Sequence, residues 1–131
     1  GLIGIGATGH EEIDRIGIHA ATQRAMLEAL DRLPVSPEWV LLDGAIVPDG
    51  CRLAALPIVG GDAKSLVVAC ASIVAKVIRD RWMARVDRLQ PEYGFGRHKG
   101  YGTFEHLRLL RTIGPGPFHR YSFRPIRPEN D

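Results

Sequence analysis

Two short apolar runs, residues 38–42 (EWVLL) and 54–59 (AALPIV), constrain the fold of this chain more than any other feature. Apolar runs of this length are typical of strands that are covered on both faces. Each run is followed by a carboxylate beside glycine, Asp43 in LLDG and Asp62 in IVGGD. Because long helical patterns alternate with these runs, we expect an α/β layer fold.

The N-terminal part of the chain predicts one more strand and a helix. Residues 2–7 (LIGIGA) are expected to form a short strand. Thr8-Gly9-His10-Glu11 has the form of a capping box, which predicts a helix over 11–32. The acidic pair Glu11-Glu12 then falls in the first helical turn, where acids favour the helix dipole, and we interpret it as structural.

The second half of the chain predicts two helices separated by a loop. Residues 65–89 are helical in pattern, and the first half is apolar all round, which predicts a central, buried helix. Asp80 within it is expected to form an ion pair with its basic neighbours. A glycine-rich basic loop over 93–103 follows, and Thr103 can cap a last helix that stops at Gly114-Pro115.

Charge is distributed unevenly along the chain. Residues 1–75 carry five Lys/Arg against nine Asp/Glu, whereas residues 76–131 carry twelve against six. The basic part suits contact with a polyanion, although a solvated helical face is the alternative. No apolar stretch approaches the roughly 20 residues of a membrane helix, and the first residues lack the basic flank of a signal peptide, so we expect a cytoplasmic protein without a membrane partner.

Asp43 and Asp62 are the first candidates for chemistry. Carboxylates at strand ends are suited to hard divalent cations. Asp43-Gly44 could instead be an ordinary turn, and Asp62 could belong to the N-cap region of the following helix. Their shared placement gives the metal site the same weight as these alternatives, because ligands in open α/β sheets gather at the carboxyl ends of strands, and both interpretations remain open.

The basic loop 93–103 is the second candidate. It combines cations with aromatic side chains, and its glycines would let the backbone approach a ligand closely, as in a loop that binds nucleic acid. The alternative is a surface loop whose aromatic residues anchor it to the core. His119 and Arg120 could contact phosphate or cap the preceding helix. The cations of the loop are Arg97, His98 and Lys99, and its aromatic residues are Tyr93, Phe95 and Tyr101.

Five sequence blocks, read together, resemble ribonuclease HII in their order and spacing. The resemblance implies an RNase H-like mixed sheet flanked by helices, with a C-terminal helical segment. It also implies hydrolysis of the RNA strand of RNA–DNA hybrids and at single ribonucleotides in duplex DNA. The blocks are Glu12-Ile13-Asp14 with its helix to Ala25-Met26, LLDG (41–44), GDAKS (61–65) leading into ASIVAKVIRD (71–80), YGFGRHKGYGT (93–103) and GPGPFHRYSF (114–123).

The resemblance implies roles for single residues. Asp43 and Asp62 fall on two of four catalytic, metal-binding acids, which together hold two Mg²⁺ or Mn²⁺ ions and leave 5′-phosphate and 3′-hydroxyl ends. Tyr101 falls on a tyrosine that packs against the sugar at the RNA-to-DNA junction. A monomer is implied for the complete protein. The residues that the resemblance places along the phosphate path are Arg97, His98, Lys99, His119 and Arg120.

Two departures from the family pattern shape the expectation. Gly60 stands where the family usually has lysine, and no Asp-Glu dipeptide or following Gly-Arg-Gly segment occurs. In the family strand order 3-2-1-4-5, residues 2–7 would be strand 3 and the two apolar runs strands 4 and 5. We therefore expect a single truncated domain over 1–131 that lacks the first two strands, with 91–131 on its nucleic-acid side. Such a chain is expected to be marginally stable with little or no hydrolysis, and a non-catalytic nucleic-acid-binding remnant is the alternative.

Overall fold

The computed structural model describes residues 1–127 and divides the chain into two compact units, Gly1–Ala75 and Lys76–Asp131. The boundary coincides with the change from an acidic to a basic balance of charge counted in the sequence. Residues 128–131, the end of the predicted basic segment 91–131, lie outside the described residues.

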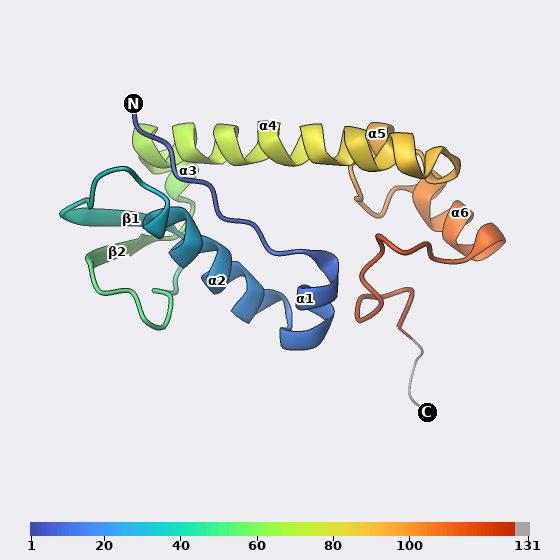
Figure 1. The fold of residues 1–131 in the computed structure, drawn as a ribbon, viewed down its shortest axis with the longest axis horizontal. Coiled ribbons are helices and arrows are strands. Elements are labelled where there is room, and N and C mark those ends of the chain that lie inside the picture. Colours follow the sequence, from blue (N-terminus) through green and yellow to red (C-terminus); the bar gives the residue numbers. More distant parts are fainter. Residues whose placement is uncertain (128–131) are drawn as a thin grey trace. The chain divides into compact units, whose positions relative to one another are not determined.

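The sheet of the first unit consists of two parallel strands, β1 (Trp39–Asp43) and β2 (Ala54–Ile58), among the described residues. Figure 1 shows them side by side, in a register that pairs Trp39 with Ala54 and Asp43 with Ile58. Both predicted strands are confirmed, and so is the α/β, RNase H-like class. The strands are not covered on both faces, because burial alternates along β1 between exposed and buried residues.

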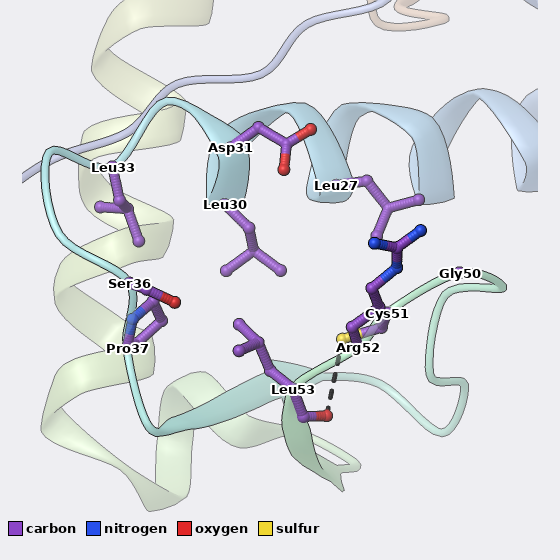
Figure 2. A pocket seen from close by; sticks show the side chains of 10 residues that line it. All are labelled: Leu27, Leu30, Asp31, Leu33, Ser36, Pro37, Gly50, Cys51, Arg52 and Leu53. Atoms are coloured by element: carbon purple, nitrogen blue, oxygen red, sulfur yellow. Dashed lines mark hydrogen bonds between the residues drawn. The ribbon is translucent and has the colours of Figure 1, made fainter.

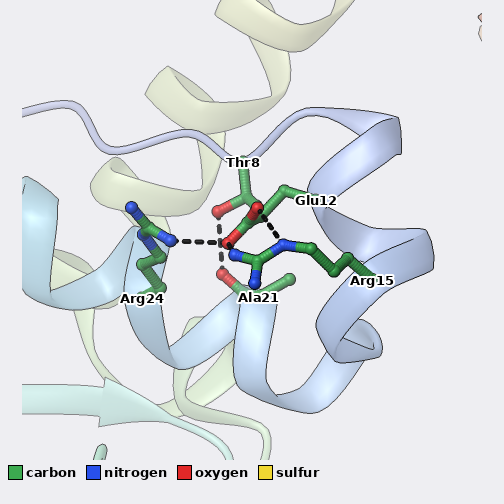
Figure 3. Close-up of polar contacts among 5 residues, drawn as sticks. All are labelled: Thr8, Glu12, Arg15, Ala21 and Arg24. Carbon is green, nitrogen blue, oxygen red and sulfur yellow. Dashed lines mark hydrogen bonds and ion pairs between the residues drawn. The ribbon is translucent and has the colours of Figure 1, made fainter.

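The predicted helix 11–32 is two helices, α1 (His10–Ile16) and α2 (Ile18–Asp31). The break lies at Gly17, whose φ of 82° and ψ of 158° are open to glycine but not to residues with a side chain. The expected capping box is wrong: the N-cap of α1 is Gly9, without a side-chain hydrogen bond. The Thr8 hydroxyl instead donates to the carbonyl of Ala21 at 2.9 Å and joins the start of α1 to α2 (Figure 3).

The predicted strand at residues 2–7 is also wrong, because residues 1–9 form no helix or strand. Gly4 and Gly6 lie directly against α2, and a Cβ added at Gly6 would be 1.8 Å from the carbonyl oxygen of Ala25. The backbone finds side-chain partners in place of a neighbouring strand. The Ala7 amide donates to Glu28 at 2.9 Å, and Arg32 donates to the carbonyl of Ile5 at 2.9 Å.

Helix α4 (Leu66–Leu89) follows the short helix α3 (Gly61–Lys64) and confirms the expected long helix. The expectation that its first half is buried is wrong, since Leu66 is 81% exposed and Ile73 62%. A helix is covered all round only where elements pack on every side. The narrow sheet and the helices of the first unit leave these side chains open. Over residues 1–127, no helix has the length and apolar character needed to cross a membrane.

The second unit contains the end of α4, a single 3₁₀ turn, η1 (Pro91–Tyr93), and helices α5 (Phe95–His98) and α6 (Phe104–Ile113). The predicted cap is confirmed, because Thr103 accepts a hydrogen bond from the His106 amide at 3.3 Å. The stop at Gly114 is confirmed as well. The predicted loop 93–103 is helical in part, because Tyr93 ends η1 and residues 95–98 form α5, and Tyr93 and Phe95 are buried in the core of this unit.

We predict that Gly6→Ala destabilises the first unit by about 2 kcal/mol, the size of an overpacking effect, because the new methyl group would overlap the α2 backbone. Gly9→Ala is the comparison variant, since its Cβ would meet nothing within 4 Å and its φ is −73°. Gly9 is the N-cap of α1, where alanine is less favourable than glycine, so a smaller loss of stability than in Gly6→Ala is expected there. Urea unfolding followed by circular dichroism measures both. Equal unfolding midpoints for the two variants would contradict the packing seen at Gly6.

Candidate metal and nucleic-acid site

Asp43 and Asp62 are brought together at the carboxyl ends of β1 and β2. The Gly61 amide, which directly precedes Asp62, donates to Oδ1 of Asp43 at 2.8 Å. A Cβ added at Gly61 would lie 3.4 Å from the same Oδ1 and 3.1 Å from Val68 Cγ1, so the turn between β2 and α3 is packed against Asp43. The Asp62 carboxylate accepts from the Ala63 amide at 2.9 Å.

Both carboxylates are exposed to solvent. For each carboxylate, one oxygen is oriented by the backbone. Within residues 1–127, the other oxygen of each carboxylate accepts no hydrogen bond. A carboxylate that is oriented through one oxygen and open at the other has the form of a ligand for a hard cation.

Two carboxylates alone fit a limited kind of metal site. Within residues 1–127, no group of three or more Asp, Glu, His or Cys side chains is placed to hold an ion. Mg²⁺ is commonly held by one or two carboxylates together with waters and substrate phosphates, so Asp43 and Asp62 fit such an ion. A pair of ions would need further ligands from outside these residues.

The turn that carries Asp62 also holds a lysine that the sequence motifs did not single out. Gly60 has φ 65° and ψ 43°, the left-handed conformation that favours glycine. Lys64 donates from Nζ to the carbonyl of Val59 at 2.7 Å and so anchors the end of α3 to the end of β2. The position of Lys64 in GDAKS, two residues after Asp62, was the available signal.

A hollow in the first unit lies away from the two carboxylates. It encloses about 590 Å³ between α2, the segment that follows it and the residues before β2. Figure 2 shows the side chains of Leu27, Leu30 and Leu53 around it, with Asp31 and Arg52 at its edge. Because neither Asp43 nor Asp62 lines it, the candidate metal ligands stand on an open surface.

The second acidic group, at Glu12, is neutralised within the protein. Its carboxylate accepts from Arg15 at 2.6 Å and from Arg24 at 2.5 Å (Figure 3). The hydrogen bond from Arg15, followed by the charges of both arginines, lowers the pKa of Glu12 below its ordinary value. The structural interpretation of Glu12 is thus consistent with its contacts, which link α1 to α2.

Two residues expected along the phosphate path, His98 and His119, are buried instead. Together with His106 they form a group of three rings, the histidine cluster. The rings of His98 and His106 stack with centroids 4.0 Å apart, and Nε2 of His106 lies 3.1 Å from Nε2 of His119. Phe95 packs against all three rings. In this conformation His98 and His119 cannot meet a phosphate directly.

The contacts of the histidine cluster assign its protons. Nδ1 of His98 accepts from the Gly100 amide at 3.1 Å, so its proton is on Nε2, which donates to the carbonyl of Tyr93 at 2.7 Å. Nδ1 of His106 faces the carbonyl of Tyr101 at 2.9 Å and therefore carries the proton. A neutral His106 then accepts at Nε2 from His119, whose Nδ1 accepts from the Gly116 amide at 3.0 Å.

The electrostatics agree with a neutral His106. Burial lowers the pKa of His106, and the nearby His98 acts in the same direction, against the Tyr101 carbonyl, which raises it. Burial also raises the pKa of Tyr93, whose hydroxyl donates to the carbonyl of Gly114 at 3.0 Å. His106 was missed by the sequence reasoning, and its only signal was a histidine in the first turn of the last helix.

The other expected nucleic-acid residues remain on the surface. Tyr101 is 60% exposed, and Arg97 is exposed beside Glu105, with which it pairs. Lys99 has a φ of 53°, the left-handed conformation. The guanidinium of Arg120 lies 4.9 Å from the ring centroid of Phe123. The ion pair expected at Asp80 is confirmed, with Lys76 as its partner at 3.1 Å.

We predict that the second unit loses stability as the pH falls below about 6.5. The pKa of His106 is lowered in the folded state from 6.5, so the unfolded chain takes up the proton first. The stability is fully present above the unfolded pKa and is lost as the pH falls through the folded one. Hydrogen exchange of the α6 amides measures the stability of the second unit, and it is compared above and below pH 6.5 in the native chain and in His106→Gln. Equal pH dependence in both chains would contradict the role of His106.

Comparison with known proteins identifies the family. A sequence model of the family described as Ribonuclease HII matches residues 5–126. Ribonuclease HII of Chlamydia pneumoniae is 49% identical over 124 residues, which cover 95% of this chain and 57% of that protein. Ribonuclease HII of Geobacillus kaustophilus is 48% identical over 125 residues, which cover 95% of this chain and 47% of that protein. The chain spans about half the length of these relatives, and it belongs to the ribonuclease HII family.

Proposed function

We propose that this chain provides metal-binding and nucleic-acid-binding parts of an endonuclease that cuts the RNA strand of RNA–DNA hybrids, and also cuts at single ribonucleotides in duplex DNA. The products are 5′-phosphate and 3′-hydroxyl ends. The observation that carries the proposal is the hydrogen bond to Asp43, at the end of β1, from the Gly61 amide, which directly precedes Asp62 in the turn after the parallel strand β2, in a member of the ribonuclease HII family.

Asp43 and Asp62 would hold Mg²⁺ or Mn²⁺ through the carboxylate oxygens that the backbone leaves open. When bound, two such ions supply an activated water and stabilise the charge on the leaving 3′ oxygen. The chain itself contributes the orientation of the two ligands, through the amides of Gly61 and Ala63. Because no third acidic ligand is grouped with them within residues 1–127, we infer that hydrolysis requires acids from outside these residues.

The basic second unit would bind the nucleic acid. Arg97, Lys99 and Arg120 would contact phosphate, and the exposed ring of Tyr101 would pack against the sugar at the RNA-to-DNA junction. His98 and His119 would support this surface from within, since both are buried and hydrogen-bonded. Phosphate contacts of this kind make binding strongly dependent on salt.

A second function, a nucleic-acid-binding protein without catalysis, is favoured by the small number of grouped acids in the described chain. The two functions differ in their use of metal. To test the endonuclease, this chain is mixed with the part of the Chlamydia pneumoniae relative that it does not cover. Cleavage of a duplex that contains one ribonucleotide is then measured. Cleavage that is lost in Asp43→Asn supports it, whereas salt-sensitive binding without any cleavage supports the binding protein.

We predict that Asp43→Asn and Asp62→Asn each weaken Mn²⁺ binding at least about tenfold, because each removes an anionic ligand oxygen. In Asp43→Asn the new side-chain carbonyl can still accept from the Gly61 amide, so the fold is retained. The protein is first stripped of metal with EDTA and dialysed, and isothermal titration with Mn²⁺ then measures the affinity. Asp49→Asn is the matched control, because Asp49 is an exposed acid whose backbone amide is bound to Gln23. If Asp49→Asn weakens binding as much, the site at Asp43 and Asp62 is wrong.

We predict that Tyr101→Ala reduces the preference for a duplex with one ribonucleotide over an all-DNA duplex by about fivefold, within the range measured for loss of one aromatic contact. Tyr101→Phe should keep the preference, since the ring face is retained. Tyr101 is exposed, so neither change should unfold the chain. Fluorescence anisotropy with both duplexes in EDTA gives the ratio of the two Kd values. An unchanged ratio in Tyr101→Ala would remove Tyr101 from the sugar contact.

A further inference from the structure

The turn that carries Tyr101 has a backbone conformation that needs support. Lys99 has a φ of 53° and Gly100 a φ of 80°, so two consecutive residues are in the left-handed region. For a residue with a side chain this conformation is unfavourable, and it persists where surrounding contacts hold it. Tyr101 follows directly, and the direction of its ring therefore depends on what fixes the turn.

Three side chains from three parts of the second unit hold this turn. His98 accepts from the Gly100 amide at 3.1 Å, and His106 donates to the carbonyl of Tyr101 at 2.9 Å. Arg79 of α4 donates from Nη2 to the carbonyl of Lys99 at 3.1 Å. The two histidines act from the buried side, and Arg79 is the member of the three that is exposed.

Arg79 also lies close to the two residues that follow Lys99. Its guanidinium carbon lies 6.0 Å from the ring centroid of Tyr101, at the limit of a cation–π contact. A Cβ added at Gly100 would lie 3.5 Å from Arg79 Nη2 and 3.3 Å from Met83 Cε, so the turn rests on one face of α4. A guanidinium is suited to this position because its rigid fork can bind a carbonyl and lie near a ring together.

We propose that Arg79 is a positioning residue that fixes the direction of the Tyr101 ring and thereby sets the preference for a ribonucleotide junction over plain DNA. This inference rests on the proposed function of Tyr101. The ring keeps most of its surface exposed for the sugar, while Arg79 and the two histidines hold the backbone that carries it. A direct contact of Arg79 with phosphate is the competing role.

The positioning role and the phosphate-contact role of Arg79 predict different changes in duplex binding. A positioning role means that Arg79→Met lowers the preference for the ribonucleotide duplex about fivefold, with no further loss when Tyr101→Ala is added, because the two residues act through one contact. Arg79→Lys should restore part of the preference, since lysine keeps the charge but loses the planar fork. A phosphate role instead means equal weakening for both duplexes and a smaller salt dependence, which would overturn the proposal.

Arg81→Met is the matched control. Arg81 lies two residues along α4, on a different face, is exposed, and has no hydrogen bond or ring contact within residues 1–127. Like Arg79→Met, the substitution Arg81→Met removes one positive charge from α4. The preference should be unchanged in Arg81→Met, and a loss equal to that of Arg79→Met would overturn the proposal, because the effect would then be one of charge alone.

A measurement without nucleic acid separates this inference from the proposed function. In Arg79→Met, the amide of Gly100 should exchange with solvent at least about threefold faster and the Tyr101 ring resonances should shift, whereas Arg81→Met should match the native chain. Unchanged exchange and ring resonances in Arg79→Met overturn the positioning role. If the native chain binds both duplexes equally while Arg79→Met changes the turn as described, the proposed sugar contact of Tyr101 fails, and with it the specificity assigned to Arg79.

Discussion

The hydrogen bond from the Gly61 amide to Asp43 is the contact on which the arrangement of the first unit depends. It joins the end of β1 to the turn that leaves β2, and the next residue along the chain is Asp62. A Cβ at Gly61 would lie 3.1 Å from Val68 Cγ1, so a side chain there would require Val68 to shift by a few tenths of an ångström. The Gly61 amide orients the Asp43 carboxylate, the Ala63 amide orients that of Asp62, and the candidate metal site is a consequence of how the sheet ends.

The second unit also depends on hydrogen bonds between side chains and the backbone, but these side chains lie in its core. Its core contains three histidines, and a buried polar group is stable only when its hydrogen bonds are made. Each ring meets backbone amides or carbonyls of the segment that follows α5 and of the turn near Gly116. The hydrogen bonds of His98 and His106 hold the backbone at Gly100 and Tyr101, so buried rings determine the conformation of a surface segment.

Much of the fold could be predicted from local patterns. The two strands, the long helix over 65–89, the Thr103 cap and the Gly114 stop follow from apolar runs and capping residues that act within a few positions of one another. The strand at residues 2–7 could not be predicted correctly, because an apolar run forms a strand only beside a partner, and here Gly4 and Gly6 pack on α2 instead. The break at Gly17 was hidden by apolar spacing that continues through it.

By itself, the sequence determined the family, the α/β class, the division of charge near residue 75, and the two acids at strand ends, because motif order, charge and strand patterning are properties of neighbouring residues. The tertiary structure alone decided which groups meet: Arg79 with the carbonyl of Lys99, twenty positions away, and His106 with His119, thirteen positions away. It also decided that Asp43 and Asp62 are exposed. Burial and hydrogen bonding depend on what packs nearby in space, and the spacing of residues along the chain does not specify it.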